Sequence, residues 1–287
     1  MRYLRPNTAA EAAESLADEP GVTRVLAGGT DVLVQLKAGM VEPDLIVDIK
    51  MIEGMRSITP EAGGFRIGAA VAGAELGAHA GVKALWPGVV EGFELIGSTQ
   101  VQGRCTMAGN LCNGSPAADS VPAMVAAGAI ARIVGPKGSR DIPVLEIPTG
   151  PGKLSLTKGE IITSIFLPAR PARSADAYLR FIPRTEMDIA VASAGVSLTL
   201  DAGGRITAAR VVLGAVAPTV RLVDAAAAAI IGTKLDDATL SKLMQAASAA
   251  CSPIDDKRGT IAFRTQVAGV LAKRAALIAY SRAGGTK

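Results

Sequence analysis

The stretch TMAGNLCNGSPAADSVP, residues 106–122, decides the fold predicted for this chain. It combines small residues with side-chain amides and one carboxylate, and small residues let a backbone bend sharply and lie close to a ligand. The apolar run VPAMVAAGAI overlaps its end, with Pro122 where the first turn of a helix tolerates proline. A polar loop that leads into a helix suits an anion, because its unpaired N–H groups point outward. An ordinary loop between a strand and a buried helix has the same composition, so this stretch alone leaves both interpretations open.

A second loop of the same character lies upstream in LAGGTDVLVQLK, residues 26–37. Gly28 and Gly29 let backbone N–H groups converge, and Thr30 adds a hydroxyl donor beside them. A pyrophosphate needs several donors at close range and no side chain in the way, so the loop suits that group. The segment is not the GxGxxG fingerprint of dinucleotide-binding folds. A hairpin turn with the same residues is the competing interpretation.

The composition is that of a globular protein with one large or two modest domains. Of the 287 residues, 49% are hydrophobic and 20% charged, whereas aromatic residues make up only 3%. So few aromatic residues argue against a stacking platform for nucleic acid. The basic residues are scattered among acidic ones, which favours a mixed solvated surface. The net charge of +4 is also compatible with an anionic cofactor or partner.

The cysteines and the single histidine do not form a metal or nucleophile pattern. Cys105, Cys112 and Cys251 include no CxxC pair, and His79 lies in a small-residue stretch, where it is expected on a helix surface. Zinc, haem and iron–sulfur binding by this chain, and a Cys–His nucleophile pair, are therefore not expected. The N-terminal residues lack the apolar core of a secretory signal, and no apolar run is long enough to span a bilayer. The expected location is the cytoplasm, with reduced thiols.

Residue periodicity and turn signals predict the order of the elements. Strands are expected at 22–27, 44–49, 65–70, 129–135, 160–168 and 177–184, and in the alternating stretch 190–216, where AGG forms a hairpin turn. Helices are expected at 8–18, 32–40, 74–80 and 84–97, and from residue 221 to the end with a break at 251–259. A composition shift at 169–177 divides the chain into 1–173, with subdomains of about 1–55 and 56–173, and 174–287.

Capping signals mark some of the helix ends. Thr8 and Glu11 have the spacing of a capping box, and Ser252 and Asp255 stand where N-caps belong. The apolar residues Val32, Leu33, Leu36 and Met40 are expected to share a helical face, or to cover a short turn, against the core.

The two loops together carry a resemblance. AGGTDVLVQLK at 27–37 followed by TMAGNLCNGSPAADSVPAM at 106–124 resembles the FAD-binding medium subunits of the molybdenum hydroxylases, which include bacterial carbon monoxide dehydrogenase and the xanthine dehydrogenases. DLIVDI, GEIITSIFLP, RVVLGAVAPT and PIDDKRGT follow in the family's order, so the likeness covers nearly the whole chain. It implies an α+β chain, with a two-subdomain FAD-binding fold of the PCMH type and a C-terminal domain of antiparallel sheet and helices.

The resemblance also implies which residues hold FAD. One loop would wrap the pyrophosphate through Ala27, Gly28, Gly29, Thr30, Asp31 and Val32. The other would wrap it through Thr106, Ala108, Gly109 and Asn110, continued by Cys112 and Asn113. Ile96 and Ile162 would line the flavin pocket, and Asp119 would anchor the nucleotide end. Arg180 matches a basic position near the isoalloxazine, and a surface salt bridge with Asp188 is the alternative for it.

The function implied by the resemblance is electron transfer within a heterotrimer. FAD here would take electrons from the [2Fe–2S] clusters of a small subunit, fed by a molybdopterin cofactor in a large subunit, and pass them to an external acceptor. A dimer of heterotrimers (a heterohexamer) is expected, without nucleic acid or an integral membrane segment. Because FAD supplies the redox chemistry, no catalytic residue and no metal ligand are expected in this chain. The alternatives are a stand-alone flavin-dependent oxidoreductase and a non-enzymatic nucleotide-binding scaffold. The chain lacks a cysteine-rich insert, which disfavours the reduction of aromatic CoA thioesters.

Overall fold

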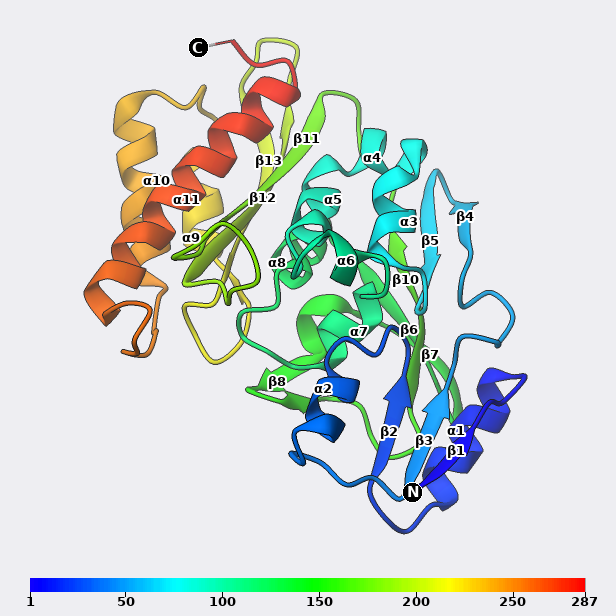
Figure 1. Cartoon of the computed structure of the whole chain (residues 1–287). Helices are drawn as coiled ribbons and strands as arrows, with labels where there is room; N and C mark the ends of the chain where they lie inside the picture. Colours follow the sequence, from blue (N-terminus) through cyan, green and yellow to red (C-terminus); the bar gives the residue numbers. More distant parts are fainter. Residues whose placement is uncertain (287) are drawn as a thin grey trace.

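The computed structural model describes residues 1–286 and arranges them around three main β-sheets (Figure 1). The first sheet is parallel, with strand order β1-β3-β2, and consists of β1 (Arg2–Leu4), β2 (Thr23–Leu26) and β3 (Leu45–Asp48). Every residue of β3 is buried, as a continuous apolar run in a central parallel strand predicts. Helix α1 (Ala9–Asp18) buries Ala12, Ala13 and Leu16, and α2 (Val32–Lys37) follows β2.

The second sheet is antiparallel, and the last of its strands in sequence lies at its centre. Its order is β4-β5-β10-β6-β7, with β4 (Ile58–Glu61), β5 (Gly64–Gly68), β6 (Ile130–Gly135), β7 (Gly138–Pro143) and β10 (Ile161–Leu167). Between β5 and β6 the chain forms α3 (Gly73–Ala78), α4 (Ala80–Leu85), α5 (Pro87–Glu94), α6 (Thr99–Gln102), α7 (Met107–Cys112) and α8 (Ser120–Ala126). A 3₁₀ turn (Val144–Glu146) and the hairpin of β8 (Pro148–Gly150) and β9 (Lys153–Leu154) precede β10.

The third sheet carries helices on both faces. It is antiparallel and consists of β11 (Ser174–Phe181), β12 (Ala192–Leu200), β13 (Ile206–Gly214) and β14 (Arg221–Leu222). The chain then forms α9 (Asp224–Ile230), α10 (Asp237–Ala249) and α11 (Ile261–Arg282). Helix α11 packs on β11 and β12 from one side, and α5 and α8 pack on the sheet from the other (Figure 1).

Two glycines allow α8 to lie directly on the third sheet. A Cβ atom on Gly195 would stand 2.8 Å from the carbonyl oxygen of Pro122, and one on Gly214 would stand 2.6 Å from its Cγ. Larger residues would therefore push α8 away from β12 and β13. The chain passes between the second and third sheets after Leu167 and before Ser174, and we keep 173/174 as the proposed domain boundary.

Helix capping follows the sequence in part. The Thr8 hydroxyl accepts the N–H of Glu11 at 3.1 Å, but the Glu11 carboxylate accepts the N–H of Asn7 and not that of Thr8. Thr260 caps α11, and the Asp255 carboxylate accepts the N–H of Ile261. The prediction that Ser252 is an N-cap is wrong, because its segment continues to Thr260 before α11 begins.

Two further predictions are corrected. Helix α2 ends at Lys37 and has no buried residue, and Leu33, Val34 and Met40 are at least half exposed, so residues 32–40 do not cover the core. The apolar periodicity described the helix correctly but did not show what lies against it. His79, expected on a helix surface, is half-buried and lies between α3 and α4, where its Nδ1 accepts the N–H of Val82.

Across residues 1–286, no helix is both long and apolar enough to cross a membrane.

Candidate functional site

A cavity of about 600 Å³ lies where the first sheet meets α7 and the segment before β10. Its volume falls within the roughly 300–1,000 Å³ of small-molecule and cofactor pockets. Fourteen of the sixteen residues predicted to hold the cofactor line this cavity. They are Ala27, Gly28, Gly29, Thr30, Asp31, Val32, Ile96, Thr106, Ala108, Gly109, Asn110, Cys112, Asn113 and Ile162.

The two glycine-containing loops lie against each other in this wall. A Cβ atom on Gly28 would stand 1.8 Å from the carbonyl oxygen of Arg104, two residues before the second loop begins. Only a glycine permits that approach of one backbone to the other. Gly29 has φ +84°, a left-handed conformation that glycine adopts without strain. In the first loop, Gly29 therefore permits the turn and Gly28 permits the contact with the second loop.

The first loop offers unpaired donors to this cavity. Within residues 1–286, the backbone N–H groups of Gly28, Gly29, Thr30 and Asp31 donate to no protein acceptor, and the Thr30 hydroxyl has no partner either. Backbone N–H groups in folded proteins are nearly always paired with protein or water. Successive unpaired N–H groups beside a cavity form a concave anion site. The donor set therefore fits the diphosphate of a dinucleotide such as FAD.

Side-chain amides join the two loops. The Nδ2 of Asn113 donates to Asp31 Oδ1 at 3.2 Å, and the Nε2 of Gln35 donates to Asn113 Oδ1 at 3.4 Å. We call this group of three residues the clasp. Within the second loop the Thr106 hydroxyl accepts the N–H of Gly109 at 3.0 Å and so caps α7. The spacing of the two loops thus depends on side chains that also line the cavity.

Asp119 and Arg180 do not line the cavity. They form an ion pair with each other at 2.5 Å between α8 and β11, and the Tyr178 hydroxyl donates to the same carboxylate at 3.0 Å. The alternative partner for Arg180 is wrong, because Asp188 pairs with Arg258 and Arg184. The roles of Asp119 and Arg180 toward the cofactor stay predictions, since neither residue lines the cavity.

Sequence reasoning missed a large part of the cavity wall. The additional lining residues are Leu16, Thr23, Arg24, Val25, Gln35, Ile49, Cys105, Gly152, Leu154, Leu156, Thr157, Lys158, Gly159, Glu160 and Ile161. Most come from β2 and from the segment before β10. The signal was the Pro- and Gly-rich run PTGPGKLSLTKGE, whose Gly159 has φ +85° and lies close to α1. Composition marked a loop there, but only the fold shows that the loop returns to the first sheet.

The titratable groups at the cavity do not form a nucleophile or metal centre. Burial raises the pKa of Cys105 to about 11 and that of Cys112 to about 12, so both are neutral thiols near pH 7 and weak nucleophiles. No group of three or more His, Cys, Asp and Glu side chains is arranged to hold a metal ion anywhere in the described part of the chain. The two cavity thiols are therefore poorly suited to nucleophilic chemistry, whereas the first loop offers hydrogen-bond donors for binding.

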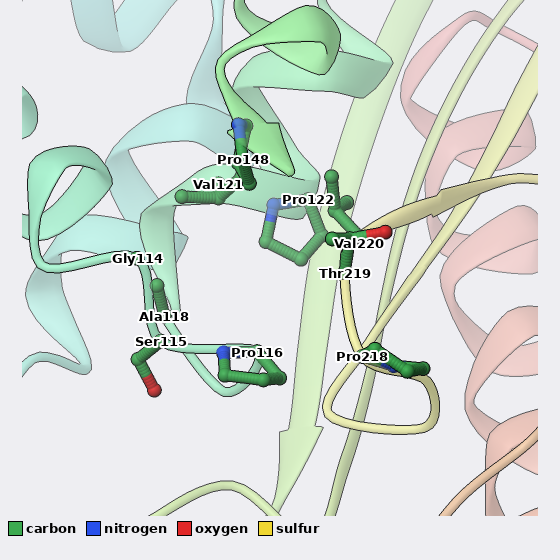
Figure 2. Close-up of a pocket in the computed structure, with 10 residues that line it drawn as sticks. All are labelled: Gly114, Ser115, Pro116, Ala118, Val121, Pro122, Pro148, Pro218, Thr219 and Val220. Atoms are coloured by element: carbon green, nitrogen blue, oxygen red, sulfur yellow. The ribbon is translucent and has the colours of Figure 1, made fainter. Parts of the chain in front are cut away.

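A second cavity lies at the contact between the two halves of the chain, where Gly114 to Pro122 face Pro218, Thr219 and Val220 (Figure 2). Its volume of about 10 Å³ is close to the space that one water molecule needs. The Ala215 N–H donates to the Pro116 carbonyl at 2.8 Å beside it, so this region is a packed junction. Of the two cavities, the first has the volume for a cofactor.

Comparison with known proteins decides the family. Residues 1–170 match the family model described as the FAD binding domain in molybdopterin dehydrogenase, and residues 177–279 match that of the CO dehydrogenase flavoprotein C-terminal domain. The chain belongs to the FAD-binding medium subunits of the molybdenum hydroxylases. These medium subunits have the α+β architecture described above, with an FAD-binding domain followed by an antiparallel sheet and helices.

The relatives cover the chain almost from end to end. The carbon monoxide dehydrogenase medium chain of Afipia carboxidovorans is 32% identical over 98% of this chain and 97% of its own length. The xanthine dehydrogenase FAD-binding subunit of Escherichia coli O157:H7 is 31% identical over 99% and 97%. A solved structure of carbon monoxide dehydrogenase from Hydrogenophaga pseudoflava contains a chain that superposes with a TM-score of 0.94, at 30% identity and 98% coverage of both chains. The medium-subunit fold is thus present over the whole compared length.

Proposed function

We propose that this chain is the FAD-carrying electron-transfer subunit of a heterotrimeric molybdenum hydroxylase. Electrons would pass from a molybdopterin cofactor in a large subunit to [2Fe–2S] clusters in a small subunit. This chain would receive them from those clusters and deliver them to an external acceptor. The observation that carries the proposal is the row of unpaired N–H groups from Gly28 to Asp31 beside a cavity of cofactor size. Family membership and the relatives named as dehydrogenase subunits support it.

The residues of this chain would bind and orient the cofactor. When bound, FAD accepts and releases electrons, so the protein needs no acid–base pair for the redox step. The Gly28–Gly29 turn would hold the diphosphate by backbone donors, with Thr30 adding a hydroxyl. The apolar side chains of Ile96 and Ile162 would exclude water at the cavity wall. The clasp would hold the two loops at the spacing that the cofactor requires.

The assembly and location belong to the same proposal. We expect a dimer of heterotrimers, as the family resemblance implies, and the relatives named as medium chains of carbon monoxide dehydrogenases support a complex of several subunits. A cytoplasmic location stays a prediction, for which the three free cysteines are the supporting observation.

The experiment has two stages. The chain is first purified alone, its absorbance spectrum is recorded, and the apoprotein is titrated with FAD. Binding of about one FAD per chain is expected, and a colourless protein that takes up no FAD would refute the proposal. The chain is then co-expressed with a small [2Fe–2S] subunit and a large molybdopterin subunit of the same family, and oxidisable substrates are tested for reduction of its flavin.

The second stage separates the alternatives. Flavin reduction by substrate in the complex, and not in the isolated chain, is expected. Turnover of a small substrate by the chain alone would identify a stand-alone oxidoreductase instead. Flavin that no substrate or reduced iron–sulfur partner can reduce would leave only a nucleotide-binding scaffold.

A further inference from the structure

Asn110 lies in the cavity wall and is bonded on one side to the start of α8. Its Oδ1 accepts the backbone N–H of Ser120 at 3.3 Å and the Ser120 hydroxyl at 2.7 Å. Ser120 is the first residue of α8 and is fully buried. The first N–H groups of a helix have no acceptor within the helix, so Asn110 supplies the acceptor that Ser120 lacks.

This contact fixes which way the Asn110 amide points. A backbone N–H can only donate, so the atom that faces Ser120 has to be the amide oxygen and not the nitrogen. The opposite end of the amide, Nδ2, has no hydrogen-bond partner in residues 1–286. Nor is it enclosed, because the one fully buried and unpartnered side-chain polar atom of these residues is the Ser155 hydroxyl. The amide oxygen of Asn110 therefore faces Ser120, and the free Nδ2 donors lie at the other end of the amide.

We propose that Ser120 is a positioning residue that makes Asn110 a donor-only contact for an oxygen acceptor on the diphosphate of the bound cofactor. The inference rests on the proposed function and extends it, since it states the chemistry of one ligand contact and the residue that sets it. Asn110 and the Gly28–Asp31 loop then supply donors to the same anion from two elements. A position that presents only N–H groups rejects any ligand whose facing atom is itself a donor.

The variant Asn110→Asp separates ligand recognition from helix capping. A carboxylate still accepts both Ser120 bonds, and a negative charge is favourable at a helix N-terminus, so the fold is retained. Its second oxygen replaces the free N–H donors with an acceptor and a like charge toward the diphosphate. The dissociation constant for FAD, measured by quenching of flavin fluorescence at pH 8, is expected to rise at least about tenfold. The melting temperature of the apoprotein is expected to stay within about 2 °C of wild type.

Two further measurements test the donor. Asn110→Asp should bind ADP more weakly by a similar factor and bind riboflavin, which has no phosphate, as the wild type does. Ser120→Ala, which keeps the N–H but loses the hydroxyl, should weaken FAD binding by about threefold.

The outcomes separate this inference from the proposed function. Wild-type apoprotein that binds no FAD would refute the proposed function. Wild-type binding together with full-affinity, folded Asn110→Asp would overturn the donor role alone. An equal loss for riboflavin would place the acceptor on the flavin and overturn the assignment to the diphosphate.

Discussion

The guanidinium of Arg180 and the carboxylate of Asp119 lie 2.5 Å apart, with side chains only 4% and 9% exposed, and connect β11 to the start of α8. Tyr178, also on β11, donates its hydroxyl to the same carboxylate. Burial raises the pKa of Asp119 to about 6, although Arg180 and Tyr178 oppose that rise. The third sheet is therefore joined to the cofactor-binding part by a charged contact inside the protein, next to the Ser120 that holds Asn110.

Removal of one partner of this pair should destabilise the chain. Asp119→Ala leaves Arg180 buried without a counter-charge, and such changes cost about 3–5 kcal/mol. Urea unfolding of the apoprotein at pH 7 measures the effect. The double variant Asp119→Ala/Arg180→Met removes both charges and should regain most of the lost free energy of unfolding. A loss below about 1 kcal/mol in the single variant would contradict the buried-pair interpretation. Normal FAD affinity in the folded double variant would argue against direct contact of either side chain with the cofactor.

The contact between the two loops should require Gly28. In Gly28→Ala the new methyl group would stand 1.8 Å from the backbone oxygen of Arg104, so the loops have to move apart. We expect at least about a tenfold weaker FAD affinity and a loss of about 1–3 kcal/mol in the free energy of unfolding. Gly103→Ala is the matched control, because its Cβ would meet its nearest neighbour at an ordinary 3.5 Å. Equal FAD affinity of the two variants would show that the close approach is not needed.

The clasp should affect binding more than folding. Asn113→Ala removes the hydrogen bonds to Asp31 and from Gln35. Both join partly exposed groups, so the free energy of unfolding should change by less than about 1 kcal/mol. The FAD dissociation rate, followed by stopped-flow fluorescence, should rise about three- to tenfold because the loops can separate. Gln35→Ala removes only the longer contact and should have a smaller effect; the reverse order would contradict the assigned role of Asn113.

The ion pair beside the cavity should give a pH-dependent contribution to stability. Hydrogen bonds from Arg140 are the main reason that the pKa of Glu160 is lowered from 4.5 to about 2. A lowered carboxyl pKa contributes stability that is complete above about pH 4.5 and is lost as the pH falls toward 2. Glu160→Gln should therefore cost roughly 1–2 kcal/mol at pH 7, a value reduced by the exposure of Arg140, and progressively less below pH 4.5. Urea unfolding from pH 7 to pH 3 tests this, and a difference that stays constant would exclude it.

Residue patterns predicted local structure well where one element sufficed. The apolar run DLIVDI forms the fully buried β3, Pro87 occupies the first turn of α5, and AGG joins β12 to β13 in a hairpin. These features depend on backbone preferences and on alternation of neighbouring residues, which are properties of short segments. Fourteen of the residues that the family resemblance implied also line one cavity, so the likeness identified positions that the fold brings together.

The errors share one physical reason, which is that a segment does not specify its neighbour. The apolar face of α2 is real, yet nothing in the described chain buries it. The salt-bridge alternative for Arg180 named Asp188 as its partner, whereas the fold brings Arg180 to Asp119, 61 residues earlier in the chain. The segment before β10 became part of the cavity because β10 enters the middle of a sheet whose other strands precede it in sequence.

The sequence by itself therefore determined the order of the elements and the two loops with small and polar residues, which follow from residue types and spacing within short stretches. It also determined the family, through a resemblance that covers nearly the whole chain. Only the tertiary structure decided that Gly28 contacts Arg104, that Asp119 pairs with Arg180 and that Ser120 holds the Asn110 amide. Hydrogen bonds and ion pairs over such separations depend on where whole elements pack, and packing is set by the cooperative burial of the core.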